Sequence, residues 1–180
     1  MGVSEFEDGF EDGQVLRDRE QLEALQLGEE LLSAQIAALE PRAAVSVSEA
    51  TSINDAIRLM LDNKIGAVLV VRNGHAVGIF TERDVLQRVA ISGIDRSCSV
   101  AAVMTPHPDV LALEDSIAFA LNLMIARGFR HIPIVDKAHR PVAVLSLREV
   151  VHYIVSLMPK RVLNLPPEPR LGIAKTPDGG

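Results

Sequence analysis

Apolar side chains recur at helical spacing in two stretches of this chain. The two sets are Ile53, Ala56, Ile57, Met60 and Leu61, and then Ile117, Ala120, Leu121, Met124 and Ile125. Positions i, i+3, i+4, i+7 and i+8 lie on one face of a helix, so each stretch predicts an amphipathic helix with one buried face.

Short runs rich in β-branched and other apolar residues follow each predicted helix. They cover residues 67–71 and 76–80 after the first helix, and residues 131–135 and 142–145 after the second. A further amphipathic helix then closes each unit, at about 82–91 and 147–157, and a short strand precedes each unit, at 45–47 and 110–113. The pattern predicts the order β-α-β-β-α twice.

The two units are copies of one repeat. Residues 52–71 align with residues 116–135 at a constant offset of 64, and residues 76–85 align with residues 141–150 at an offset of 65. The extra residue falls in a predicted hairpin turn, which tolerates an insertion. A unit of this size buries too little apolar surface to be stable alone, so we expect the copies to pack face to face across their sheets. The predicted fold class is α/β (α+β), a pseudo-twofold pair of repeats.

Two flanking segments complete the predicted organisation. Residues 1–40 form an acidic extension with an amphipathic helix over residues 15–39, which Pro41 ends. Repeat 1 then covers residues 41–98 and repeat 2 covers residues 99–158. Residues 159–180 form a tail that holds five of the ten prolines and should be largely extended.

Charge and composition exclude several classes of protein. The net charge of −6 divides into −9 for residues 1–40 and +3 for the remainder, an excess too small to predict binding to duplex nucleic acid. With no Trp and one Tyr, the chain also lacks stacking platforms for single-stranded bases. The apolar runs are far shorter than a membrane span. Cys98 is the single cysteine, and the first twelve residues are acidic rather than leader-like, so we expect a cytoplasmic protein.

The sequence offers little for catalysis or metal binding. The five histidines show no metal-ligand spacing, and there is no phosphate-binding loop of the Gly-x-x-x-x-Gly-Lys type and no Gly-x-Ser-x-Gly nucleophile motif. Asp84 and Glu149 could be considered as an acid and base pair, but a helix start explains each better, and no nucleophile completes a site. We therefore expect no catalytic residue, no bound metal and no enzyme activity.

The segment "GIFTERD", residues 78–84, has two possible functions. Thr81 and Asp84 approximate a capping box, and Ser146 with Glu149 form the more usual Ser-x-x-Glu version in the second copy. The pattern alone favours capping. Each motif also carries an arginine, which capping does not need and which the positive end of a helix disfavours. A helix start with free N–H groups, a hydroxyl and an arginine suits an anion, while an exposed ion pair remains an alternative for the arginine.

The chain resembles a tandem cystathionine-β-synthase (CBS) domain pair, a nucleotide-sensing regulatory module, over residues 43–92 and 107–157. The resemblance depends on the doubled β-α-β-β-α order, on "GFRHIPIVD" before the second hairpin, on "VMTP" between the copies and on "GIFTERD". It resembles the stand-alone two-repeat type of bacteria. It implies a regulatory ligand rather than a required cofactor: an adenine nucleotide (AMP, ADP or ATP) or S-adenosylmethionine.

The resemblance also implies where such a ligand binds. In these pairs the carboxylate of one copy holds the ribose, and basic residues of the other copy approach the phosphate. The implied ligand-binding set is Thr81, Arg83, Asp84, Arg130, His131, Ile65 and Pro133. A second and weaker site would be formed by Lys64, Ser146, Arg148 and Glu149, because Glu149 replaces the usual Asp and a basic partner is missing unless Lys64 reaches in.

The sequence thus predicts a non-catalytic sensor that signals through the packing of a homodimer, acting on an unknown regulated protein. Three alternatives stay open: a ligand-independent protein-interaction module, a nucleic-acid-binding protein and an enzyme. Stabilisation by a nucleotide would favour the sensor, and its absence would favour the interaction module. A gel shift that depends on salt would favour nucleic-acid binding.

Overall fold

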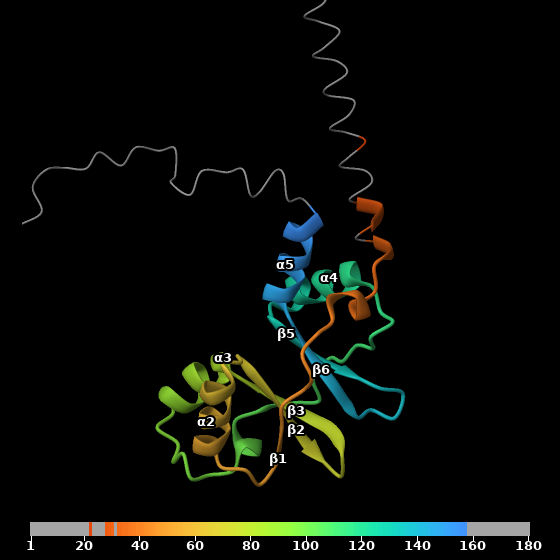
Figure 1. Ribbon diagram of the computed structural model, residues 1–180. Coiled ribbons are helices and arrows are strands. Elements are labelled where there is room, and N and C mark those ends of the chain that lie inside the picture. The colour runs from red at the N-terminus through yellow and green to blue at the C-terminus, as the bar shows by residue number, and fades with distance from the viewer. Residues whose placement is uncertain (1–21, 23–27, 31, 158–180) are drawn as a thin grey trace, which may run out of the picture.

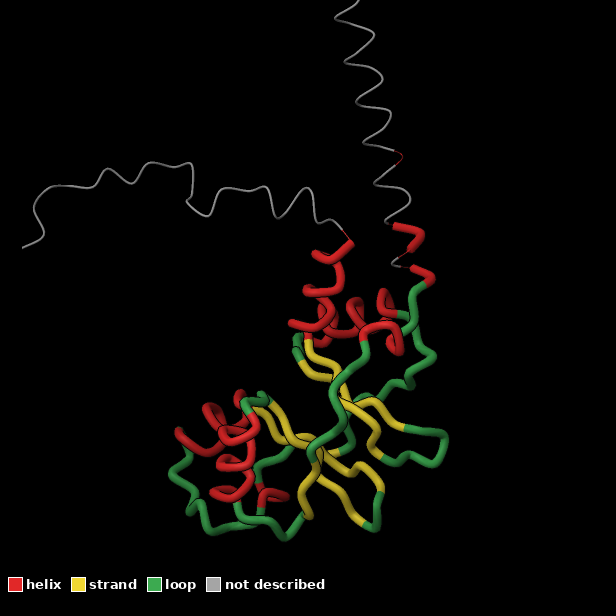
Figure 2. The backbone as a smooth tube through the Cα atoms, viewed as in Figure 1, coloured by secondary structure: helices red, strands yellow, loops and turns green. Residues whose placement is uncertain are grey.

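The computed structural model describes residue 22 and residues 28–30 and 32–157 of the 180-residue chain. The two copies form two lobes whose strands meet in the middle, with the main helices of each lobe on its outer side (Figure 1). Figure 2 shows the same arrangement by element type, with the strands gathered between the two groups of helices. The prediction of a mixed α and β fold built from two repeats is confirmed.

The first copy forms most of a four-stranded sheet with the order β1-β2-β3-β4. Its elements are β1 (Ser46–Ser48), α2 (Ile53–Asn63), β2 (Ala67–Arg72), β3 (His75–Thr81), α3 (Glu82–Asp84) and the π-helix η2 (Val85–Ala90). β1 runs parallel to β2, and β2 and β3 form an antiparallel hairpin. The single α-helix expected over residues 82–91 is thus α-helical for one short turn and then takes the wider π form, within which Val89 is buried.

The second copy repeats this plan with a smaller sheet. Its elements are α4 (Ile117–Arg127), β5 (His131–Val135), β6 (Pro141–Ser146) and α5 (Leu147–Leu157), after the short helix η3 (Val100–Ala102) and β4 (Thr105–Pro106). The strand predicted over residues 110–113 is reduced to one parallel bridge between Leu111 and Ile134. The chain turns away directly afterwards, because the carboxylate of Asp115 accepts the N–H of Ala112 at 2.7 Å.

The helices α2 and α4 begin in the same way and end differently. Ser52 accepts the N–H of Asp55, and Ser116 accepts the N–H of Phe119, so each helix has a serine N-cap. Each helix ends on a residue in the left-handed conformation, which is Lys64 in α2 and Gly128 in α4. Glycine adopts this conformation without steric cost, whereas lysine does not.

The two copies exchange the segments that precede them. The N–H of Ala44 donates to Val142 O in the second copy at 3.0 Å, and the N–H of His107 donates to Val77 O in the first copy at 3.0 Å. Val77 and Val142 are equivalent positions of the repeat, so the two contacts are related by the pseudo-twofold axis. Between the sheets lies a small apolar cluster of Ala67, Leu69 and Ile79, with Ala44 and Val144 packed against it.

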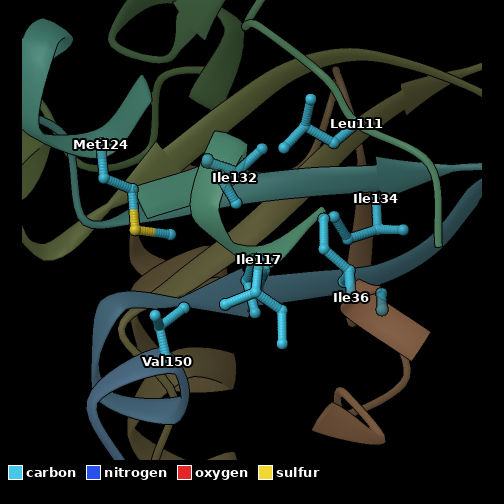
Figure 3. Packing of buried hydrophobic residues seen from close by; sticks show 10 residues of the cluster. Ile36, Leu111, Ile117, Met124, Ile132, Ile134 and Val150 are labelled. Carbon is cyan, nitrogen blue, oxygen red and sulfur yellow. The ribbon is translucent and has the colours of Figure 1, made fainter. Parts of the chain in front are cut away.

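A segment before the first copy completes the core of the second. Figure 3 shows Ile36 among the buried side chains of that lobe, and Ile36 is fully buried. It lies in the 3-10 helix η1 (Ile36–Leu39), whose first N–H donates to Asp115 O at 2.9 Å. Most of the helix predicted over residues 15–39 lies outside the described residues. At its described end, Ser33 is the last helical residue, because the backbone beyond it bonds to the second copy instead.

Within the described part of the chain, no helix combines the length and the apolar character that a membrane crossing requires.

Candidate functional site

A cavity of about 710 Å³ lies between the two copies, where α2 ends and α5 begins. The first copy lines it with Lys64, Ile65, Gly66 and Glu82, and the second copy lines it with His131, Ser146, Arg148 and Glu149. Arg42, in the exchanged segment before the first copy, also lines it. The cavity therefore corresponds to the second of the two predicted clefts, together with His131 and Ile65 from the first predicted set.

The N-terminus of α5 holds its carboxylate through a capping box. One oxygen of Glu149, Oε2, accepts the N–H and the hydroxyl of Ser146, each at 2.7 Å, while Ser146 Oγ accepts the N–H of Glu149 at 3.3 Å. The capping predicted for this motif is thus present. Among residues 32–157, the other oxygen, Oε1, accepts no hydrogen bond, so half of a carboxylate that lines the cavity is free for hydroxyl groups.

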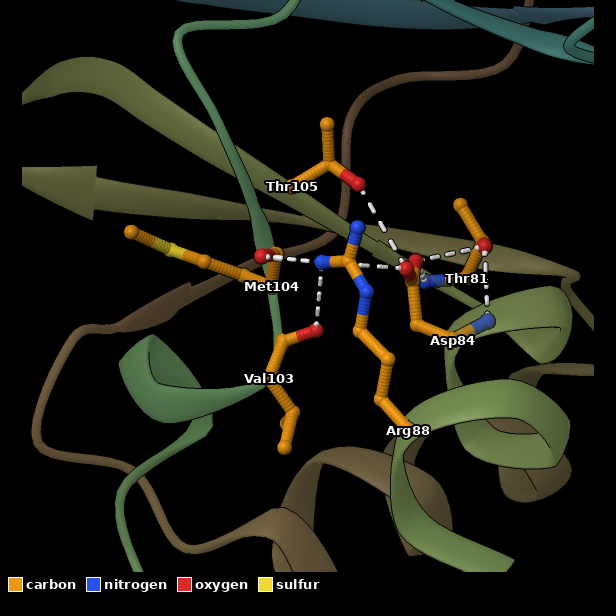
Figure 4. A network of polar contacts seen from close by, with 6 residues as sticks. All are labelled: Thr81, Asp84, Arg88, Val103, Met104 and Thr105. Atoms are coloured by element: carbon orange, nitrogen blue, oxygen red, sulfur yellow. Dashed lines mark hydrogen bonds and ion pairs between the residues drawn. The ribbon is translucent and has the colours of Figure 1, made fainter. Parts of the chain in front are cut away.

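The equivalent carboxylate of the first copy is fully engaged (Figure 4). Oδ2 of Asp84 accepts the N–H of Thr81 at 2.9 Å and its hydroxyl at 2.7 Å, which makes the first capping box. Oδ1 accepts the hydroxyl of Thr105 at 3.4 Å and lies 3.5 Å from Nη1 of Arg88. With 6% of its surface exposed, Asp84 is a buried charged residue. Both of its oxygens have partners inside the protein.

The arginine in that network connects a helix to the segment between the copies. Nη1 of Arg88 donates to Val103 O at 3.1 Å and to Met104 O at 2.6 Å while it faces Asp84 (Figure 4). Thr105 approaches the same carboxylate from that segment. The "VMTP" motif is therefore tied to the first capping box by a cation and a hydroxyl.

The arginines of the two motifs have different partners. Arg83 donates to Gly128 O, the carbonyl at the end of α4, and so bridges the two copies at the first motif. Its equivalent, Arg148, faces the cavity, and Lys64 stands where the other cleft has Gly128. Among the described residues, the side chains of Arg148 and Lys64 form no ion pair or hydrogen bond. Two cations therefore face the second cleft without a protein partner, and a cross-cleft hydrogen bond spans the first.

His131 is the group whose protonation the cavity alters. Burial lowers the pKa of His131 below its usual value, the carboxylates of Glu82 and Glu149 partly oppose this, and Arg130 adds to the lowering. The imidazole lies against Gly66, where an added Cβ would come within 3.0 Å of Cε1 and Nε2. A side chain at position 66 would therefore require the imidazole to shift by a few tenths of an ångström, and burial favours the neutral form of the histidine.

The other predicted residues lie outside the cavity lining. Thr81, Arg83 and Asp84 are engaged as described above. Arg130 is exposed, with its carbonyl accepting the N–H of Leu147 at 2.8 Å, and Pro133 is buried in β5 opposite Val144. Strand register explains why His131 lies at the second motif and not at the first. His131 is opposite Ser146 of its own copy, and Thr81 is opposite Ala67 of its own copy.

Sequence reasoning did not identify Arg42, Glu82 or His152, which also line the cavity. Arg42 could have been found only by recognising that the segment before each copy is exchanged to the other, because nothing in its local sequence marks it. Arg42 also supplies a basic group, in addition to Lys64, to the cavity that Glu149 lines.

The doubled α and β repeat, its exchanged leading segments and the polar cavity between the copies define a tandem-repeat module with a cleft between its halves. Comparison with known proteins places that module in a family. The model of the CBS domain matches residues 39–91 and 100–156, more than half of the chain. The chain belongs to the CBS domain family, and the predicted resemblance is confirmed.

Relatives of known sequence or structure agree with this assignment. The chain is 40% identical over 103 residues to the meiotically up-regulated gene 70 protein of Schizosaccharomyces pombe, a match that spans 56% of this chain and 14% of that protein. A CBS domain protein of Pyrobaculum aerophilum, complexed with AMP, is 21% identical with a TM-score of 0.61, over 68% of this chain and 99% of that one. The CBS domain pair of protein MJ0100, in complex with 5′-methylthioadenosine and S-adenosyl-L-methionine, is 16% identical with a TM-score of 0.63, over 68% and 97%. These two structures share the fold.

Proposed function

We propose that this protein is a non-catalytic regulatory module that binds an adenine nucleotide or a related adenosyl compound in the cavity between its CBS repeats. One observation carries the proposal: Glu149 presents a free carboxylate oxygen to a cavity in which two cations also lack a protein partner among the described residues. A carboxylate accepts the hydroxyl groups of a ribose, and cations with helix N–H groups accept a phosphate.

The size of the cavity supports the same class of ligand. A volume of about 710 Å³ falls within the usual range for small-molecule sites, about 300–1,000 Å³. Ile65 and Val144 supply apolar surface beside the polar groups, which suits a purine ring. The complexes of structural neighbours with AMP and with S-adenosyl-L-methionine are consistent with the proposal.

We propose that the ligand acts by shifting how two chains pack against each other. A ligand can shift an equilibrium only if it binds one arrangement more tightly than another. The cavity is formed jointly by both copies, so closing it on a ligand would favour one relative placement of the lobes. We propose that a homodimer in the cytoplasm transmits this change to a regulated protein.

A ligand screen with capping variants tests the proposal. AMP, ADP, ATP and S-adenosylmethionine are titrated into the full chain, and thermal unfolding and calorimetry are recorded. A bound ligand at one hundred times its Kd adds about 2.7 kcal/mol to the free energy of unfolding. We expect Glu149→Ala to abolish this stabilisation and Asp55→Ala to keep it, because Asp55 accepts the hydroxyl of the N-cap serine of α2 but does not line the cavity.

Three outcomes have different meanings. Loss of binding in Glu149→Ala alone supports the cavity. Loss of binding in Asp84→Ala with binding retained in Glu149→Ala would assign the ligand to the first motif, with Thr81, Arg83, Arg130, His131 and Pro133 as its candidate residues. If none of the four compounds stabilises the protein, the sensor proposal fails and a ligand-independent interaction module is the better account.

A further inference from the structure

The cavity is lined by more cationic than anionic side chains. Three permanent cations line it, Arg42, Lys64 and Arg148, against two carboxylates, Glu82 and Glu149. They come from three separate parts of the chain, namely the segment before the first copy, the end of α2 and the first turn of α5. One oxygen of Glu149 is already committed to the capping box. The five charged side chains have a net charge of +1, which favours an anion.

Lys64 is held there at a conformational cost. Its φ of 52° and ψ of 45° lie in the left-handed region, where a residue with a Cβ is disfavoured. The equivalent helix end in the second copy has the residue that this conformation favours, Gly128, with φ 72°. The fold therefore needs no side chain at this position, and glycine would close α2 at lower cost. Strained residues of this kind are often kept where the side chain has a function.

The position of Lys64 suggests what that function is. Its backbone N–H caps α2 by donating to Leu61 O and Met60 O, so the cap depends on the main chain and not on the ammonium group. The residue is exposed and lines the cavity together with Arg148. Like charges around one cavity repel each other until an anion occupies it, and the N-terminus of the eleven-residue helix α5 adds further attraction for negative charge.

We infer that the cavity selects its ligand by negative charge, with Lys64 as a specificity-determining residue that acts on the phosphate chain. The inference rests on the proposed function and narrows it. Among adenosyl compounds the order of affinity is ATP and ADP first, then AMP, then adenosine, because each phosphate adds an anion for the three cations. S-adenosylmethionine, which carries a cationic sulfonium at the position of the phosphates, binds more weakly than AMP.

The substitution Lys64→Gly tests this directly, because it removes the side chain and relieves the backbone. Calorimetric titrations use adenosine, AMP, ADP, ATP and S-adenosylmethionine in buffer without divalent cations, at two NaCl concentrations. We expect Lys64→Gly to weaken ATP binding about tenfold and adenosine binding less than twofold, and to keep or raise the unfolding temperature. In the wild-type protein, ATP binding should weaken with NaCl while adenosine binding stays nearly constant.

Two control variants separate charge from backbone effects. Asn73→Gly also replaces a left-handed residue by glycine, at φ 52° in the hairpin between β2 and β3, and Lys137→Ala removes an exposed cation that does not line the cavity. Neither should change ATP affinity by more than about twofold. Two results would overturn charge selection and leave nucleoside binding in place. One is that S-adenosylmethionine binds as tightly as ATP, and the other is that Lys64→Gly leaves the ATP titration unchanged. Failure of every compound to bind would instead overturn the proposed function itself, and the selection with it.

Discussion

Replacing the two capping carboxylates should have unequal effects on stability. Asp84→Ala removes a capping box, which is worth about 1 kcal/mol, and also removes the acceptor for Thr105 and the ion-pair partner of Arg88. A hydrogen bond to a buried charged group contributes about 1.5–3 kcal/mol, but the bond to Thr105 is long and Arg88 is partly exposed, so the lower end applies. We expect a total loss of about 2–3 kcal/mol.

Glu149→Ala removes only the capping box, because the second carboxylate oxygen has no partner among the described residues. The expected loss is about 1 kcal/mol. Urea denaturation followed by circular dichroism measures both variants, with the midpoint and the slope fitted together. Asp55→Ala provides the reference for a capping acid on α2 that has no further contacts.

The informative quantity is the difference between Asp84→Ala and Glu149→Ala in the free energy of unfolding that each variant loses. If Asp84→Ala and Glu149→Ala lose equal stability, then the Thr105 and Arg88 contacts contribute nothing, and the claim that the first carboxylate is occupied by the protein is refuted. Combining Asp84→Ala with Thr105→Val separates the two contributions further, because the second change should add little once the carboxylate is absent.

Three further predictions concern other positions in the same regions. His131 has a lowered pKa in the folded state, so the unfolded chain takes up a proton more readily than the folded chain as the pH falls through the unfolded pKa near 6.5, and the free energy of unfolding decreases. In His131→Gln, urea midpoints between pH 7.5 and 5.5 should therefore vary less than in the wild type. An equal pH dependence would contradict the burial of the imidazole. Gly66→Ala should destabilise the protein by about 1 kcal/mol in thermal unfolding, the lower end of the cost of overpacking, because its Cβ would lie 3.0 Å from that imidazole and the ring must shift by a few tenths of an ångström; full stability would contradict the close approach. Gly78→Ala should force the side chain of Met104 to move, since its Cβ would lie 2.3 Å from Sδ of Met104, and in a double-mutant cycle with Met104→Ala the coupling energy should equal most of the cost of Gly78→Ala; a coupling energy of zero would contradict the contact.

Local patterns in the sequence were sufficient for most of the fold. The apolar spacing in α2 and α4, and the serine before each helix, depend on neighbouring residues, so the helices begin where predicted. The strand β5 and the helix α5 also have the predicted bounds. The departures occur where distant segments compete for the backbone. The residues after Ser33 leave the helix because they bond to the second copy, and the π-helix η2 replaces a regular helix beside the Arg88 contacts.

The candidate site was harder to predict because its asymmetry is tertiary. Both capping motifs are visible in the sequence, and both form. Whether a carboxylate is then free depends on Thr105 and Arg88, which approach Asp84 from another segment and another helical turn. The exchange of leading segments also brings a third cation, Arg42, to the cavity that Lys64 and Arg148 line. Alignment of the two repeats could not reveal either contact.

The proposed nucleotide site lies at the second motif, between Glu149 and the cations of the first copy and its leading segment. The most direct measurement is an amide chemical-shift titration of the isotopically labelled full chain with ATP. We expect the largest shifts at Gly66, His131 and Arg148, which line the cavity. Shifts concentrated at Arg83, Asp84 and Gly128, with the cavity residues unchanged, would contradict it.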